Sequence, residues 1–283
     1  MGIEYVEAIR YNDTMSTAHD NTKISEKPVG FFDSGVGGLS VLKTAYTLMP
    51  DENYVYFGDN LNAPYGEKSE EEIKALSMAA GEFLFSKGVK AIVVACNTAT
   101  SAAIQMMRDK FNLPVISMEP AVKPALAALS GGKVLVLATP ATVAQARYLH
   151  LLNRLDAGDR VISVGCGGLV ELIEAGQIDE ASIHGYLENR LDFLAGEKID
   201  AVVLGCTHYS FAEASIKSYI DHVFDTDCPV YDGRHGTARQ LQHVLDEQGL
   251  RRTASTPGSV QFFASAPDYP TEHFRQIFLS FYS

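Results

Sequence analysis

Two segments of the chain end an apolar run in a cysteine that hydrogen-bonding residues follow, and thiols placed this way could transfer protons. The segments are 91–98, which contains Cys96, and 201–208, which contains Cys206. Continuous runs of aliphatic and β-branched residues are typical of parallel strands covered on both faces. Open α/β sheets place their ligand chemistry at the carboxyl ends of such strands. A free cysteine is often only a small core residue, but two matched contexts favour a functional interpretation of both thiols.

Two thiols on opposite sides of one carbon atom could invert a stereocentre. A thiolate would remove a proton from one face while a thiol donates a proton to the other. The ordinary thiol pKa of about 8.5 needs only a modest downward shift, near a helix N-terminus or a cationic histidine, to give thiolate at neutral pH. Asp33 and His208 each follow a predicted strand and could orient or deprotonate a cysteine. His208 could instead be an ordinary surface histidine.

The carbanion left by removing an α-proton from an amino acid is unstable, so the protein must bind the neighbouring carboxylate and exclude water. The glycine-rich loop 33–38 follows the first predicted strand, where backbone N–H groups can face an anion. Ser40 stands where a dinucleotide fingerprint needs glycine, and the glycine–lysine pair of a Walker loop is missing. The loop is therefore either a tight structural turn or a carboxylate-binding loop.

Strand-like and helix-like segments alternate from residue 28 onward, which predicts βαβ units and a largely parallel sheet. Ser69 and Glu72 form a capping box for a helix that runs to about Ser86. Further helices are predicted near 99–111, 143–155, 183–194, 237–248 and 271–281. The order of loop, helix, strand and cysteine occurs twice, as expected for two similar halves that each supply one thiol.

We therefore predict an α/β fold of two similar domains, each a mainly parallel sheet flanked by helices, with the active site in the cleft between them. The first domain is expected to contain residues 28–119 plus 229–283, and the second residues 120–228. Residues 1–27 are polar and show no sustained period, which predicts a poorly ordered leader.

The composition limits the class of protein. The chain has 283 residues, of which 46% are hydrophobic and 20% charged, as in a soluble globular protein. Its net charge of −12 repels phosphate backbones, so we expect no nucleic-acid partner. No apolar run approaches the roughly 20 residues that span a bilayer, and no secretory signal is visible, which predicts a cytoplasmic protein without a membrane partner.

The four cysteines lack the short spacing of zinc or redox sites. Cys206 and His208 could share a metal, but no second ligand pair at a suitable spacing completes the set, so we predict no metal.

Taken together, five motifs resemble those of the cofactor-independent glutamate racemases of the aspartate/glutamate racemase superfamily. They lie at 33–39, 64–66, 96–99, 119–121 and 205–209, and the resemblance extends over nearly everything from Pro28 onward. It implies a two-domain α/β enzyme that interconverts L- and D-glutamate without pyridoxal phosphate or any other cofactor. It also implies a supply of D-glutamate for bacterial peptidoglycan, and the expected assembly is a homodimer.

The same resemblance implies roles for individual residues. Cys96 would abstract the proton from D-glutamate with help from Asp33, and Cys206 would abstract it from L-glutamate with help from His208. The family's acidic residue maps onto Glu174. The substrate contacts map onto Ser34, Pro64, Tyr65, Gly66, Asn97, Thr98, Thr139, Thr142 and Thr207.

The chain departs from the family's pattern at three places. Gly167 and Glu171 stand where prolines are usual, Ser210 stands where a proline is common, and Gly233 replaces a serine. Three other interpretations stay open: a racemase for aspartate or another amino acid, a decarboxylase or isomerase of the same fold, and a catalytically idle regulatory protein that binds a partner. The presence of both cysteines favours racemisation.

Overall fold

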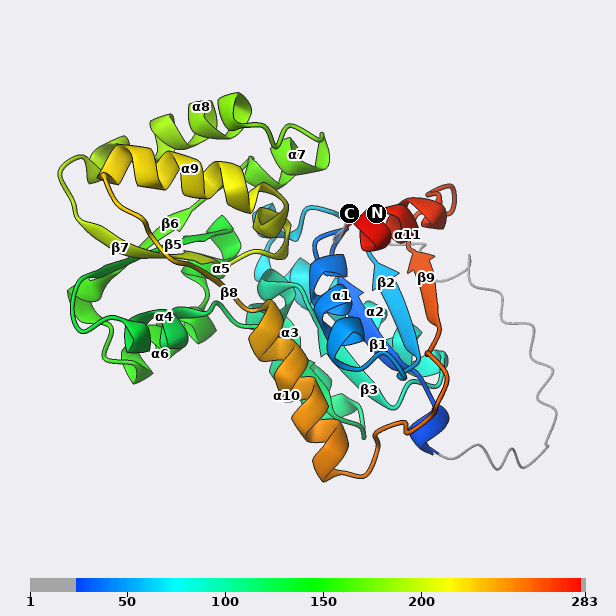
Figure 1. Cartoon of the computed structure of the whole chain (residues 1–283). Coiled ribbons are helices and arrows are strands. Elements are labelled where there is room, and N and C mark those ends of the chain that lie inside the picture. The colour runs from blue at the N-terminus through cyan, green and yellow to red at the C-terminus, as the bar shows by residue number, and fades with distance from the viewer. Residues whose placement is uncertain (1–23, 281–283) are drawn as a thin grey trace, which may run out of the picture.

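The apolar runs form the strands of two separate parallel sheets in the computed structural model, which describes residues 24–280 (Figure 1). The first sheet has the strand order β4-β3-β1-β2-β9 and the second the order β6-β5-β7-β8. When the strands of each half are counted from its own first strand, both sheets contain the order fourth, third, first, second, and β9 extends only the first. The repeat in the sequence is therefore also a repeat in topology. The first sheet contains β1 Val29–Asp33, β2 Tyr54–Gly58, β3 Ala91–Val94, β4 Val115–Ser117 and β9 Val260–Ala264, and the second contains β5 Lys133–Ala138, β6 Val161–Gly165, β7 Ile199–Leu204 and β8 Val230–Asp232.

Helices cover both faces of each sheet, which explains why the central strands are apolar throughout rather than alternating. One face of the first sheet packs against α1 Leu39–Leu48, α10 Arg234–Glu247 and α11 Thr271–Ser280, and the other against α2 Glu70–Ser86 and α3 Asn97–Lys110. One face of the second sheet packs against α7 Leu169–Glu174, α8 Glu180–Leu191 and α9 Glu213–Phe224, and the other against α4 Val122–Ala128 and α6 Ala146–Arg154. Short 3-10 turns lie at η1 Ile24–Glu26, η2 Tyr65–Glu67, η3 Gly158–Arg160, η4 Asp192–Leu194 and η5 Thr207–Ala212.

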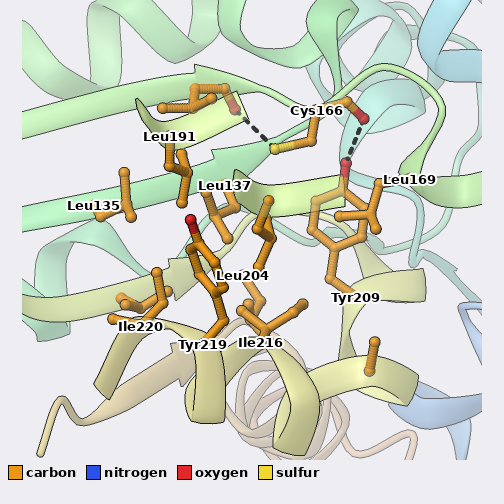
Figure 2. Close-up of a cluster of buried hydrophobic side chains, with 14 of the residues drawn as sticks. Leu135, Leu137, Cys166, Leu169, Leu191, Leu204, Tyr209, Ile216, Tyr219 and Ile220 are labelled. Carbon is orange, nitrogen blue, oxygen red and sulfur yellow. Dashed lines mark hydrogen bonds between the residues drawn. The ribbon is translucent and has the colours of Figure 1, made fainter. Parts of the chain in front are cut away.

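Figure 2 shows the core of the second lobe, where leucines of the sheet face Ile216 and Ile220 of α9. Cys166 belongs to this core and is 1% exposed. Its thiol donates to the carbonyl of Val164 at 3.7 Å, and its own carbonyl accepts the hydroxyl of Tyr209 at 3.2 Å. The environment of Cys166 is therefore that of a core residue.

Local sequence signals account for several helix ends. The predicted capping box is present, because the Ser69 hydroxyl accepts the Glu72 N–H while the Glu72 carboxylate accepts the Ser69 N–H. The helix predicted at 143–155 is instead two helices, α5 Pro140–Ala144 and α6, because the backbone of Gln145 is extended. The hydroxyl of Thr139 caps α5, and Pro140 occupies its first turn, a position that tolerates proline.

Two details of the predicted domain division need correction. Residues 229–283 were expected in the first domain, but β8 pairs with β7 in the second sheet, with Val230 beside Val202. A strand of three residues is too short to give a periodic signal, and we propose that the second domain extends through Asp232. Of the predicted leader, residues 1–23 lie outside the described residues, whereas Ser25 and Glu26 make contacts with Lys90 and Arg252.

The amino end of the first sheet contains a buried ion pair. Lys90 Nζ lies 2.5 Å from a carboxylate oxygen of Glu52, and both side chains are fully buried. The other carboxylate oxygen of Glu52 accepts the backbone N–H of Arg252 at 2.7 Å. Lys90 therefore joins β3 to the segment before β2, at the end of the sheet opposite the cysteines.

We predict that Lys90→Met lowers the free energy of unfolding by about 3–5 kcal/mol, because buried Glu52 loses its hydrogen-bonded cation and keeps only Arg251, whose Nε lies 3.5 Å away. Urea denaturation followed by circular dichroism measures the change. The double variant Lys90→Met, Glu52→Leu should recover much of the loss, since no buried charge is then left unpaired. A single variant within about 1 kcal/mol of the parent would show that the pair is not what stabilises this end of the sheet.

Candidate active site

Side chains that the sequence singled out come from strand ends of both sheets and meet between the lobes. Asp33 ends β1, Cys96 follows β3, and Cys206 follows β7. The hydroxyl of Thr207 donates to Asp33 Oδ2 at 3.1 Å, which joins the two lobes directly. Cys96 is 5% and Cys206 8% exposed, so both thiols belong to a buried cluster.

Cys96 is the capping residue of α3. Its sulfur accepts the N–H of Ala99 at 3.4 Å, and its thiol donates to the hydroxyl of Ser34 at 3.6 Å. Burial, and next the negative charge of Asp33, raise the pKa of Cys96 to about 12. In this closed arrangement Cys96 is a thiol, the form that donates a proton.

Asp33 is a fully buried carboxyl group. Burial raises its pKa, although the charge of His208 and the N–H of Gly35, which donates to Asp33 Oδ1 at 3.0 Å, act in the opposite direction. Asp33 therefore interacts with both thiol centres. Its charge raises the pKa of Cys96, and its carboxyl group accepts a hydrogen bond from Thr207, the neighbour of Cys206.

Cys206 has a different partner. Its sulfur lies 3.9 Å from Nδ1 of His208, and Nε2 of the same ring lies 2.8 Å from Glu174 Oε1. Burial alone lowers the pKa of His208, but the hydrogen bonds with Cys206 and Glu174 prevail and raise it well above its usual value. Burial likewise raises the pKa of Glu174, but the bond to His208 prevails and lowers it. An imidazolium that faces a sulfur stabilises negative charge there.

Three hydroxyl groups connect the lobes beside the thiols. The Thr98 hydroxyl lies 2.9 Å from that of Thr139 and 3.2 Å from that of Thr142, and these two lie 2.9 Å apart. Asn97, which precedes Thr98 in the chain, is 2% exposed, and neither polar atom of its amide has a hydrogen-bond partner. A buried amide without partners is costly, and it suits a group that receives a polar ligand.

Glycines of the first lobe allow the two lobes to approach. A Cβ atom at Gly37 would lie 2.7 Å from His208 Nδ1 and closer still to Thr207 Oγ1. A Cβ atom at Gly35 would lie 2.6 Å from Glu174 Oε1, and one at Gly66 would lie 2.8 Å from the Cβ atom of Thr139. Only glycine fits these positions without displacing the opposite lobe.

The hydroxyl of Tyr65 is not directed toward a ligand, because it is already bonded within the first lobe. It donates to Asp59 Oδ2 at 2.5 Å, and the residue is 1% exposed. Pro64 and Gly66 lie in the same loop, and Gly66 is the member that approaches Thr139. Asp59 was not singled out from the sequence, although it directly follows β2 much as Asp33 ends β1, and this parallel was a usable signal. Tyr56, which donates to the carbonyl of Gly35 at 2.8 Å, gave no such signal because aromatic residues are common in core strands.

Within residues 24–280, no group of three or more His, Cys, Asp or Glu side chains is placed to hold a metal ion. In the same range, no helix combines the length and the apolar character needed to cross a membrane.

Comparison with known proteins identifies relatives that match most of the chain. Residues 40–241 match the family described as Asp/Glu/Hydantoin racemase. A glutamate racemase of Clostridium botulinum (strain Okra) is 44% identical over 245 residues, which cover 87% of this chain and 94% of that protein. The crystal structure of glutamate racemase isoform RacE1 from Bacillus anthracis has a TM-score of 0.79 at 32% identity, covering 90% of this chain and 94% of the other. A glutamate racemase from Francisella tularensis in complex with D-glutamate has a TM-score of 0.78 at 28% identity, with the same two coverages.

We predict that Gly37→Ala holds the lobes apart, because its methyl group would overlap Thr207 and His208. Alkylation by iodoacetamide, with the modified cysteines identified by mass spectrometry, should then become at least about tenfold faster at Cys96 and Cys206, since about 1.4 kcal/mol of lost closure suffices for this. Gly185→Ala is the control, because a Cβ atom there meets nothing within 4 Å. Equal alkylation rates in both variants and the parent would contradict the close packing of the glycine loop.

Proposed function

This chain belongs to the Asp/Glu/Hydantoin racemase family, and on that premise we propose that it interconverts L- and D-glutamate by proton transfer between Cα and two thiols. The observation that carries the proposal is the buried cluster between the lobes, in which Cys96 and Cys206 come from matching strand ends and have unlike partners. A substrate carbon between the two sulfurs would meet one acid and one base.

In the direction from L- to D-glutamate, Cys206 acts as the base. Its thiolate forms an S–H bond as the Cα–H bond breaks, and the electron pair of that bond stays on Cα. Cys96, held as a thiol, donates its proton to the opposite face of Cα and becomes a thiolate. His208 stabilises the negative charge of the Cys206 sulfur before the transfer, and the carboxylate of Glu174 keeps the imidazole cationic.

In the direction from D- to L-glutamate the roles reverse. The Cys96 thiolate removes the proton, and Cys206 donates one. The high pKa of Cys96 makes it a strong base once it is ionised, and the positive ammonium group of a bound amino acid would favour that ionisation. Ser34, whose hydroxyl already bonds to this sulfur, can donate to the thiolate.

Asn97 and the threonines supply the polar groups that an amino-acid substrate needs. We propose that the unpartnered amide of Asn97, together with Ser34, Thr98, Thr139, Thr142 and Thr207, receives the carboxylate and ammonium groups of glutamate. For the loop 64–66 we propose contact through the backbone of Tyr65 and Gly66, because the Tyr65 hydroxyl is engaged by Asp59. Fixed donors aimed at the carboxylate stabilise the charge that develops when Cα loses its proton.

The cellular role follows from the product. We propose that the enzyme supplies D-glutamate for bacterial peptidoglycan in the cytoplasm and that it acts as a homodimer. The family membership and the likeness to glutamate racemases support this role. Sedimentation equilibrium of the purified chain measures the assembly, and a monomer at micromolar concentration would refute the dimer.

We predict that the enzyme incorporates deuterium at Cα of L-glutamate in deuterated water and that optical rotation decays to zero. Cys96→Ala and Cys206→Ala should each lower racemisation by about 10²–10⁴-fold or more, because each removes the acid or base on one face. Polarimetry follows the rotation, and NMR follows the loss of the Cα proton.

Cys228→Ala is the matched control, since Cys228 is fully buried and its thiol donates to the carbonyl of Ile199 at 3.2 Å. It should keep racemase activity close to that of the parent. If aspartate racemises while glutamate stays inert, the substrate is wrong and an aspartate racemase is indicated. If neither amino acid reacts, the regulatory binding protein is favoured instead.

A further inference from the structure

Tyr56 is a fully buried tyrosine of β2 whose hydroxyl reaches the glycine loop beside the candidate site. It donates to the carbonyl oxygen of Gly35 at 2.8 Å. Burial, and next the charge of Asp33, raise the pKa of Tyr56 well above its usual value, so the hydroxyl stays protonated and remains a donor. The ring is held by Phe274 of α11, whose centroid lies 5.4 Å away in an edge-on arrangement.

The carbonyl that Tyr56 binds belongs to the same peptide unit as the N–H of Val36. A trans peptide is planar, and its C=O and N–H point in opposite directions. Glu174 of the second lobe lies against this peptide, since its Oε1 would be 2.6 Å from a Cβ atom at Gly35, and the N–H of Val36 is among the groups that lower the pKa of Glu174. The peptide between Gly35 and Val36 therefore has Tyr56 at one end and Glu174 at the other.

The close approach of Glu174 to this peptide depends on the glycine. A Cβ atom at Gly35 would lie 2.6 Å from Glu174 Oε1, the oxygen that bonds to His208 at 2.8 Å. Any rotation of the peptide would move the Val36 N–H away from this carboxylate. One hydroxyl of the first lobe thus fixes a donor that holds a charged pair of the second lobe.

We propose that Tyr56 is a positioning residue for the second thiol centre: its hydroxyl aligns the Gly35–Val36 peptide, the peptide holds Glu174, and Glu174 orients His208 beside Cys206. This inference rests on the proposed racemase function for its consequences in activity. The geometry itself is independent of that function.

The direction of the pH effect follows from the groups around His208. Cys206, Glu174 and Asp33 face the imidazole, and their effects raise its pKa. The pKa of Glu174 is in turn lowered by His208 and by the charge of His273 in α11. The charge of Glu174 raises the pKa of Tyr269. A Glu174 that is less well aligned would bond more weakly to His208, so the pKa of His208 would fall. Activity that needs cationic His208 would then be lost at a lower pH.

The test compares Tyr56→Phe with Tyr54→Phe. Tyr54 is also in β2 and 1% exposed, and its hydroxyl donates to the carbonyl of Met49 at 2.9 Å, at the end of α1. The Tyr54 hydroxyl also lies 3.2 Å from the carbonyl of Ala45, so Tyr54→Phe should lower Tm at least as much as Tyr56→Phe. Only Tyr56→Phe should lower kcat/KM, by about fivefold, and move the basic limb of the pH profile to lower pH, by about 0.5 unit, as expected for one net hydrogen bond.

A Tyr56→Phe variant that matches Tyr54→Phe in kcat/KM and in the pH profile would overturn the proposal, because its hydroxyl would then be merely structural. In a Glu174→Gln background, Tyr56→Phe should have little further effect on the pH profile. Full additivity of the two changes would also overturn the proposed connection.

Two readouts on the protein without substrate separate this inference from the racemase proposal. Nitrogen-15 NMR should show a lower titration midpoint for His208 in Tyr56→Phe than in the parent. In the parent protein, the Val36 amide should exchange with solvent more slowly than in Glu174→Ala, which tests the peptide even if Tyr56→Phe does not fold. Equal midpoints, or equal Val36 exchange rates, would refute the positioning role whether or not the enzyme racemises glutamate.

Discussion

The hydrogen bond from Thr207 to Asp33 is the contact on which the candidate site depends, because it joins the strand end of one lobe to that of the other. A carboxyl group buried this deeply is costly unless its oxygens have partners. Gly35 N–H supplies one partner from its own loop, but Thr207 comes from the opposite lobe. The contact between the lobes therefore gives Asp33 one of its hydrogen-bond partners, and both thiols are buried in this arrangement.

The two halves repeat in topology, but they do not repeat in chemistry. Cys96 faces a hydroxyl and a buried carboxyl group, whereas Cys206 faces an imidazolium held by a carboxylate. Inversion at a carbon by two thiols needs one protonated thiol as the acid and one thiolate as the base. The unlike surroundings of Cys96 and Cys206 favour different protonation states before the substrate binds. Because enantiomers have equal free energies, kcat/KM must be equal in both directions in any racemase. The asymmetry can therefore appear only in kcat and KM taken separately.

The sequence was informative wherever local pattern decides structure. The apolar runs before Cys96 and Cys206 predicted buried parallel strands, and Ser69 with Glu72 predicted a helix start, because strand burial and capping depend on neighbouring residues. The family motifs likewise pointed to Glu174, which the structure places beside His208. What could not be predicted depends on packing between distant segments. The extended backbone of Gln145, the pairing of β8 and the engagement of Tyr65 by Asp59 leave no periodic signal.

None of the departures from the family's pattern replaces a thiol or a residue bonded to a thiol. Gly167 offers its carbonyl to Tyr186 at 2.8 Å, and the Ser210 hydroxyl donates to the carbonyl of Thr207 at 2.7 Å, a bond that a proline at position 210 could not make. Gly233 lies at the second connection between the lobes, and a Cβ atom there would lie 2.9 Å from the carbonyl oxygen of Glu119 in the first. A serine at this position would force the connections apart. Glycine allows the two connections to lie in contact. The exchange at residue 233 therefore concerns the packing of the two connections, while the chemistry of the site is left to residues that match the family.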